Sequence, residues 1–232
     1  MPVSLEKRRR EAEWMDDPQA DPAILEDSLR FIRRINFWLG YTRATLGHLE
    51  RFSRRWPRNQ TIRIVDLATG SGDLPRAILR WAEKSGFSVQ VVGIDRHATT
   101  AAAAQRQEPN LQIIRGDVLE MPLADGSFDY AITGMFLHHL DDAEVVGVFR
   151  IMDRLSRRGV IAADLLRDRR AYFWIKQITR LSNPMVRHDA VVSVGQAFTE
   201  SEIVALRDQA GLSYAKFHRH FAHRFVLAGE KV

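Results

Sequence analysis

The stretch Ile64–Pro75 constrains the fold of this chain more than any other part of the sequence. A short β-branched run there contains Asp66, and Gly70 and Gly72 follow before a segment with helical composition. Glycine has no Cβ, so a loop with two glycines can turn sharply and approach a ligand closely. A strand, a glycine loop and a helix in this order are typical of nucleotide-binding units in a doubly wound sheet.

Two residues argue against a dinucleotide. The third glycine of a G-x-G-x-x-G motif would fall at position 75, which is Pro75. Asp73 would lie beside the helix N-terminus, where its charge would repel a pyrophosphate. The loop therefore predicts a cationic or zwitterionic nucleoside as its ligand.

Further pieces of sequence narrow this prediction. Residues 89–95 read as a second strand that ends in Asp95, whose carboxylate can accept hydrogen bonds from both hydroxyls of a ribose. Gly116-Asp117-Val118 and Phe128-Asp129-Tyr130 follow in order. With these pieces the chain resembles the class I S-adenosylmethionine-dependent methyltransferases over about residues 61–165. The alternative is an unrelated Rossmann-like domain whose glycines serve only a tight turn.

The alternation of strands and helices predicts an α/β fold, a Rossmann-like, doubly wound, mostly parallel sheet of seven strands. The strands are expected at 62–67, 89–95, 111–115, 128–133, 159–165, 214–218 and 224–228, and the helices between them at 74–84, 98–107, 141–155 and 200–210. Two amphipathic helices, at about 22–35 and 37–55, precede the first strand. We therefore expect an N-terminal helical cap over residues 1–58 and a methyltransferase domain over 59–232. An insertion at 167–198, with a short helix at 169–181, would follow strand five.

The resemblance implies S-adenosylmethionine as cofactor, S-adenosylhomocysteine as product, and a set of binding residues. Asp66 would orient the methionine end, Asp95 the ribose, and Asp117 with Val118 the adenine. The end of strand four would lie under the sulfonium. The full set of expected cofactor-binding residues is Asp66, Ala68, Thr69, Gly70, Gly72, Asp95, Arg96, Asp117, Val118, Thr133, Gly134 and Met135.

Three histidines are candidate catalytic bases, because an imidazole can accept a phenol or alcohol proton near neutral pH. His138 and His139 follow strand four, and His188 lies in the insertion beside Asp189. Neighbours in sequence point in different directions, so the adjacency of His188 and Asp189 is no evidence of a dyad. Each histidine could equally be a packed or capping residue.

A narrower resemblance extends outside the core. Met15–Pro18, Arg34–Asn36, Leu39-Gly40, Gly72–Pro75, Phe136–Leu140 and Arg187–Asp189 together resemble bacterial small-molecule methyltransferases associated with type III polyketide synthases. This resemblance implies O-methylation of a phenolic or polyketide-like aromatic acceptor. The alternatives are a C-methyltransferase of quinone biosynthesis, an RNA methyltransferase, or a cofactor-binding domain without catalysis. The end of strand four lacks the Asn/Asp-Pro-Pro-Tyr/Phe motif of enzymes that methylate nucleobase amines.

Composition limits the partners. The 34 basic and 29 acidic residues give a net charge of +5, but the arginines are scattered instead of forming the compact stripe typical of nucleic-acid binding. Cysteine is absent, which fits a cytoplasmic protein and removes cysteine-based metal sites; no metal site is expected. The basic N-terminus lacks the apolar stretch of a signal peptide, and no run is apolar enough to span a bilayer. The sequence predicts no particular oligomeric state.

Overall fold

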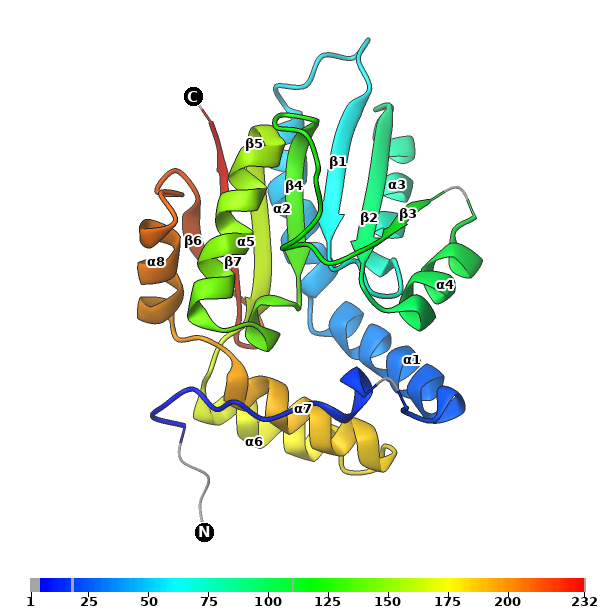
Figure 1. Ribbon diagram of the computed structural model, residues 1–232, viewed down its shortest axis with the longest axis vertical. Helices are drawn as coiled ribbons and strands as arrows, with labels where there is room; N and C mark the ends of the chain where they lie inside the picture. Colours follow the sequence, from blue (N-terminus) through cyan, green and yellow to red (C-terminus); the bar gives the residue numbers. More distant parts are fainter. Residues whose placement is uncertain (1–4, 18, 110, 232) are drawn as a thin grey trace.

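A seven-stranded sheet forms the centre of the computed structural model, which describes residues 5–17, 19–109 and 111–231 (Figure 1). The strand order is β3-β2-β1-β4-β5-β7-β6, with β1 to β5 parallel, β7 antiparallel to β5 and β6 antiparallel to β7. The strands are β1 (Ile62–Leu67), β2 (Val89–Asp95), β3 (Gln112–Arg115), β4 (Phe128–Gly134), β5 (Ser156–Leu165), β6 (Lys216–His220) and β7 (Arg224–Glu230). This is the predicted Rossmann-like, mostly parallel α/β fold, closed by a C-terminal hairpin.

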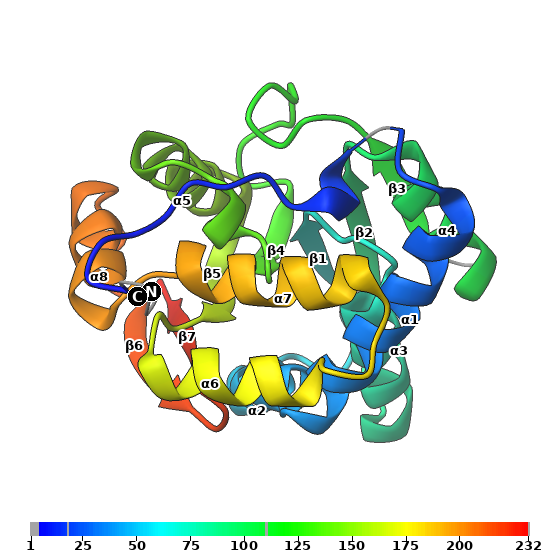
Figure 2. The same cartoon turned by 90° about the horizontal axis from the view of Figure 1, so that it is seen from below.

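Helices cover both faces of the sheet because its strands are apolar on both sides. One face packs on α5 (Asp142–Leu155) and α8 (Glu200–Gln209), through residues such as Phe149 and Ile203. The other face packs on α2 (Tyr41–Ser53), α3 (Asp73–Ser85) and α4 (Ala98–Gln107), through residues such as Leu49 and Ile78. Three further helices, α1 (Pro22–Trp38), α6 (Arg169–Ile178) and α7 (Pro184–Gln196), gather at the carboxyl ends of the parallel strands (Figures 1 and 2).

The structure corrects three predicted boundaries. The helix expected at 37–55 is α2, which begins later, at Tyr41. The preceding helix α1 continues to Trp38, and the chain then turns at Gly40, whose φ is 82°. The strand expected at 214–218 begins two residues later, at Lys216. The predicted insertion at 167–198 contains two helices: α6 on the expected segment, and α7, which was not predicted.

The predicted boundary at residue 58 lies within continuous packing. Leu49 and Phe52 of α2 belong to the same buried cluster as Ile62 and Ile64 of β1, and Trp56 donates a hydrogen bond of 2.8 Å to the Tyr130 hydroxyl of β4. α2 is therefore one of the layers of the fold. The division into a cap and a catalytic domain stays a prediction.

Residues 5–17, here called the N-terminal segment, run alongside α7 (Figure 2). Within this segment Trp14–Asp16 forms the short 3-10 helix η1. Arg9 N donates to Gly195 O, and the amides of Trp14 and Met15 donate to the two carboxylate oxygens of Asp189 at 2.8 and 2.9 Å. Pro18 and residues 1–4, which belong to the motifs discussed above, lie outside the described residues. Among the described residues, no helix combines the length and apolarity needed to cross a membrane.

Candidate functional site

The loop between β1 and α3 has the conformation that its glycines allow. Ala68, Gly70 and Gly72 all adopt positive φ, and the Gly70 amide donates to Asp95 Oδ2 at 2.8 Å. A Cβ on Gly72 would lie 3.0 Å from Cβ of Ala104, so a larger residue would push α3 and α4 apart. The loop is thus fixed to the end of β2, and its outer side borders a cavity.

This loop cavity has a volume of about 400 Å³ and lies at the carboxyl ends of β1, β2 and β4. The predicted cofactor-binding residues that line it are Asp66, Ala68, Thr69, Gly70, Asp95, Arg96, Asp117, Val118, Gly134 and Met135. The other two do not line it: Gly72 packs against α4, and Thr133 is fully buried and donates to Leu67 O. The structure brings ten of the twelve residues together, and their individual roles stay predictions.

Carboxylates set the electrostatics of the loop cavity. Burial and the nearby charge of Asp95 raise the pKa of Asp66 to about 7, although a hydrogen bond from Thr69 Oγ1 opposes this shift. Asp95 accepts from Gly70 N, His97 N and Thr100 Oγ1, and a carboxylate has lone pairs left for further donors. Asp73 stands in the first turn of α3 and is paired with Arg76. A buried acid without a cationic partner and an occupied helix N-terminus fit a cationic ligand better than a pyrophosphate.

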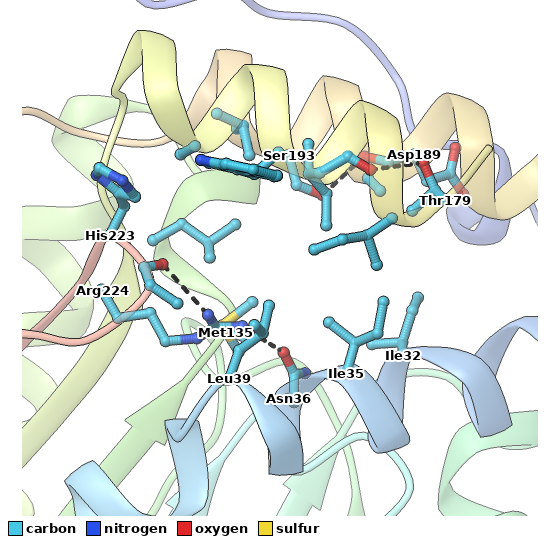
Figure 3. Close-up of a pocket in the computed structure, with 18 of the residues that line it drawn as sticks. Ile32, Ile35, Asn36, Leu39, Met135, Thr179, Asp189, Ser193, His223 and Arg224 are labelled. Carbon is cyan, nitrogen blue, oxygen red and sulfur yellow. Dashed lines mark hydrogen bonds between the residues drawn. The ribbon is translucent and has the colours of Figure 1, made fainter.

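A second, larger cavity of about 640 Å³ adjoins the first and is here called the apolar cavity (Figure 3). Its walls come from α1, α6, α7 and the turn between β6 and β7, with side chains such as Ile35, Leu39 and Ile175. Ile32, Asn36 and Met135 line both cavities. A mostly apolar cavity with a few polar groups that opens toward a cofactor site is suited to an acceptor substrate.

Three buried polar side chains near the apolar cavity form a connected row, which consists of Glu13, His138 and Asp164. His138 Nδ1 lies 2.6 Å from Asp164 Oδ1, and His138 Nε2 lies 3.7 Å from Glu13 Oε1. Burial opposes the ionisation of Asp164, but His138 outweighs it and holds the pKa of Asp164 below its usual value. Glu13 accepts from Ser193 Oγ at 2.6 Å and lines the apolar cavity, whereas His138 lines neither cavity. Glu13 is thus the member of the row that an acceptor can reach.

His139 and His188, the other two candidate bases, are both paired. His139 lines the loop cavity, and its Nδ1 lies 3.1 Å from Asp16 Oδ2. Burial lowers the pKa of His139, but Asp16 and Glu13 outweigh it and raise the pKa to about 9, so this imidazole is protonated at neutral pH. His188 lines neither cavity; its Nδ1 lies 2.8 Å from Asp189 Oδ1, and its ring stacks on Trp14.

Glu13, His138 and His139 also place three potential metal-ligand atoms within 4.8 Å of one another. Each has a protein partner: Ser193 for Glu13, Asp164 for His138 and Asp16 for His139. These partners account for the cluster without a cation. The expectation that the site needs no metal stays a prediction.

Sequence reasoning missed many lining residues of these cavities, among them Glu13, Asn36, Tyr41 and Arg224. Tyr41 lies so close to Gly134 that a Cβ there would collide with its phenol ring. The Arg34-Ile35-Asn36 motif was noticed, and Glu13 belongs to a stretch whose docking on the body could be suspected from its apolar pair in an acidic turn. No signal in the sequence pointed to Arg224.

Comparison with known proteins identifies the kind of enzyme to which this chain is similar. Residues 64–159 match the family described as "Methyltransferase domain". The chain is 29% identical over 175 residues to the 2-phytyl-1,4-naphtoquinone methyltransferase of Synechococcus elongatus, which covers 67% of this chain and 73% of the relative. It is 32% identical over 97 residues to the demethylmenaquinone methyltransferase of Beutenbergia cavernae, covering 42% and 37% of the two chains. The chain is a methyltransferase that uses S-adenosylmethionine.

A solved structure shares the fold of this methyltransferase. The plantazolicin methyltransferase BpumL superimposes with a TM-score of 0.62 at 13% identity, over 88% of this chain and 74% of that one. The residues of the loop cavity fit S-adenosylmethionine: Asp66 suits an ammonium group, Asp95 a ribose, and Asp117 an adenine amino group. The apolar cavity meets the loop cavity at Ile32, Asn36 and Met135.

Proposed function

We propose that this methyltransferase methylates a ring carbon of a hydroxylated aromatic acceptor that carries an apolar substituent. The main observation in support of this acceptor is the apolar cavity of about 640 Å³, which meets the loop cavity at Ile32, Asn36 and Met135. The relatives support an acceptor of this kind, because their names give a phytyl naphthoquinone and a demethylmenaquinone as substrates. A cytoplasmic location, expected from the absence of cysteine, is part of the proposal.

The reaction needs a base, because a neutral phenol is a poor carbon nucleophile and its phenolate a good one. Bound S-adenosylmethionine supplies an electrophilic methyl group on its sulfonium. Glu13 is placed to accept the acceptor hydroxyl proton, and His138, paired with Asp164, can take the proton from Glu13. The ring carbon then forms a bond to the methyl carbon as the carbon–sulfur bond breaks. Loss of the ring proton to the same row of residues restores the aromatic ring.

The base assignment is tested by substituting Glu13. Glu13→Gln should lower kcat by about 10²–10⁴ with unchanged affinity for S-adenosylmethionine, and Glu13→Asp should retain part of the activity. Glu11→Gln, a half-exposed acid on the same N-terminal segment, is the matched control. Full kcat in Glu13→Gln would reject Glu13 as the base.

O-methylation of a phenolic, polyketide-like acceptor is the second candidate. The motifs Phe136–Leu140 and Arg187–Asp189, shared with the polyketide-associated group, favour it, and the same cavity would hold an alkylated resorcinol. The two reactions share the deprotonation and differ in which atom receives the methyl group.

Product analysis separates the two candidates. Purified enzyme is incubated with methyl-labelled S-adenosylmethionine and either a demethylmenaquinol or 5-pentylresorcinol, and the position of the label is read by NMR. A C–CH₃ signal from the quinol supports the first proposal. An O–CH₃ signal from either acceptor favours the second candidate, and no label in either acceptor rejects both.

A further inference from the structure

Arg224, the first residue of β7, is a buried cation that lines the mostly apolar cavity, whose other charged lining residues include Glu13, Asp189 and Arg219. Only 4% of its surface is exposed, and its guanidinium lies at the cavity floor beside Met135 and Asn36 (Figure 3). Burying a charge is costly unless it is paired and hydrogen-bonded. A charge in this position is therefore stable only when an anion or several hydrogen-bond acceptors lie against it.

The described residues supply that partner only in part. Arg224 Nη2 donates to Asn36 Oδ1 at 2.9 Å, and Nη1 has a long contact of 3.4 Å with Ala222 O, both neutral acceptors. Arg224 Nε is buried without a hydrogen-bond acceptor, and no carboxylate of the described residues forms an ion pair with this guanidinium. Arg167, another buried arginine, is satisfied by contrast, because Glu202 accepts two of its N–H groups.

Asp164 is the acid whose charge acts on Arg224, but its carboxylate is already engaged. Its oxygens accept from His138 Nδ1, His138 N and Leu165 N. Burial consequently dominates and lowers the pKa of Arg224 to about 10. An arginine held charged at the end of the apolar cavity, with only two neutral acceptors and no ion pair among the described residues, is suited to bind an anionic oxygen.

We propose that Arg224 is the oxyanion-binding residue of the acceptor site, so that the acceptor is an aromatic hydroxyl compound bound as its phenolate. The proposal rests on the proposed function for the acceptor class and adds the form in which the acceptor binds. Asn36 lines both cavities and holds the guanidinium, which places the phenolate oxygen near the boundary with the loop cavity. Glu13, on the side of α7, would receive the proton released on binding.

The proposal is tested by the ionisation of a bound phenol, which requires no methyl transfer. The probe is 4-nitrophenol, whose phenolate absorbs visible light and whose phenol does not, titrated with wild-type enzyme in the presence of S-adenosylhomocysteine. We expect the pKa of the bound probe to fall by about one unit or more relative to free probe. Arg224→Gln should abolish this shift and weaken binding about tenfold or more, and Arg224→Lys should restore part of the shift. Arg150→Gln, an exposed arginine outside both cavities, should behave as wild type.

Arg224→Met keeps the test valid if the Gln variant folds poorly, because it fills similar space without a charge. Wild-type-like probe ionisation in Arg224→Gln or Arg224→Met would overturn the proposal. The outcome is also independent of the proposed reaction. A probe ionised through Arg224 in an enzyme that methylates no quinol would leave this inference standing, whereas quinol methylation at the wild-type rate and KM by Arg224→Gln would reject it.

Discussion

At the scale of single residues, Asp66 links cofactor binding to pH. Its pKa of about 7 means that about half of the free sites carry a protonated Asp66 at neutral pH. The ammonium group of S-adenosylmethionine binds the ionised form better. We therefore expect cofactor affinity, measured by calorimetry, to rise several-fold from about pH 6 to about pH 8. A flat profile would show that Asp66 does not face the ammonium.

The same pKa predicts a gain in stability when Asp66 is neutralised. The native-state pKa exceeds the unfolded value near 3.8, so the neutral acid favours folding at low pH and this contribution is lost as the pH rises through 7. At pH 8, Asp66→Asn should raise the free energy of unfolding by about 1–4 kcal/mol and weaken cofactor binding more than tenfold. Asp125→Asn, at an exposed acid, should change neither in denaturant and binding measurements.

The cluster of Glu13, His138 and His139 predicts metal-independent activity. Asp164 and Asp16 already pair with the two imidazoles, so the residues need no cation to be stable in the fold. Enzyme dialysed against a chelator should keep its full rate of methyl transfer. Loss of activity that added Zn²⁺ or Mn²⁺ restores would instead assign a metal to this cluster.

Local sequence identified the residues of the loop cavity well, because Asp66, Gly70 and Asp95 stand at the ends of strands whose pattern is readable. Glu13 and Arg224 carry the same kind of chemistry but were not found. They reach the apolar cavity only because the N-terminal segment lies alongside α7 and because β7 lies antiparallel to β5. Both are consequences of long-range packing, which a local pattern does not contain.

At the scale of elements, Gly134 at the end of β4 is fixed by the phenol of Tyr41 in α2. A Cβ on Gly134 would overlap that ring, so Gly134→Ala should cost about 1–3 kcal/mol of unfolding free energy. It should also lower cofactor affinity, since both residues line the loop cavity. Gly147→Ala, inside α5 with only an ordinary contact to Leu119, should be neutral or stabilising by up to about 1 kcal/mol. Equal effects of the two substitutions in thermal unfolding would contradict this account.

The elements themselves were predicted to within a few residues where their periodicity was clear, as for β1 and α4. α7 was missed because its apolar residues are distributed around the whole helix, with Val186, Val192 and Val194 all buried. It lies between α6, the N-terminal segment and the apolar cavity, so no polar face marks its period. The break between α1 and α2 depends on the left-handed conformation of Gly40, which the helical pattern on either side conceals.

At the scale of the whole molecule, both cavities are closed by chain that lies outside the matched methyltransferase region of residues 64–159. α1, α6 and α7 supply most of the wall of the apolar cavity, and the N-terminal segment adds Glu13. The nucleotide-binding half of the site could thus be predicted from a widespread pattern. The acceptor half could not, because it depends on how these separate segments pack together.

The N-terminal segment should come away from the body as the pH rises. One of its attachments is the pair of Asp16 and His139, and the pKa of His139 is raised to about 9. This attachment is fully present below the unfolded-state pKa of about 6.5 and is lost as the pH rises through 9. Trypsin cleavage after Arg8, Arg9 or Arg10 should therefore accelerate from about pH 8 to about pH 9.5 relative to cleavage of an unstructured peptide with the same sequence. In Asp16→Asn the acceleration should begin at lower pH, since His139 loses its main ionic partner, whereas Asp125→Asn should leave it unchanged.

Because the same segment carries Glu13 to the apolar cavity, turnover should fall over the same pH range. A loss of turnover with unchanged protection from trypsin would place the titrating group elsewhere in the site.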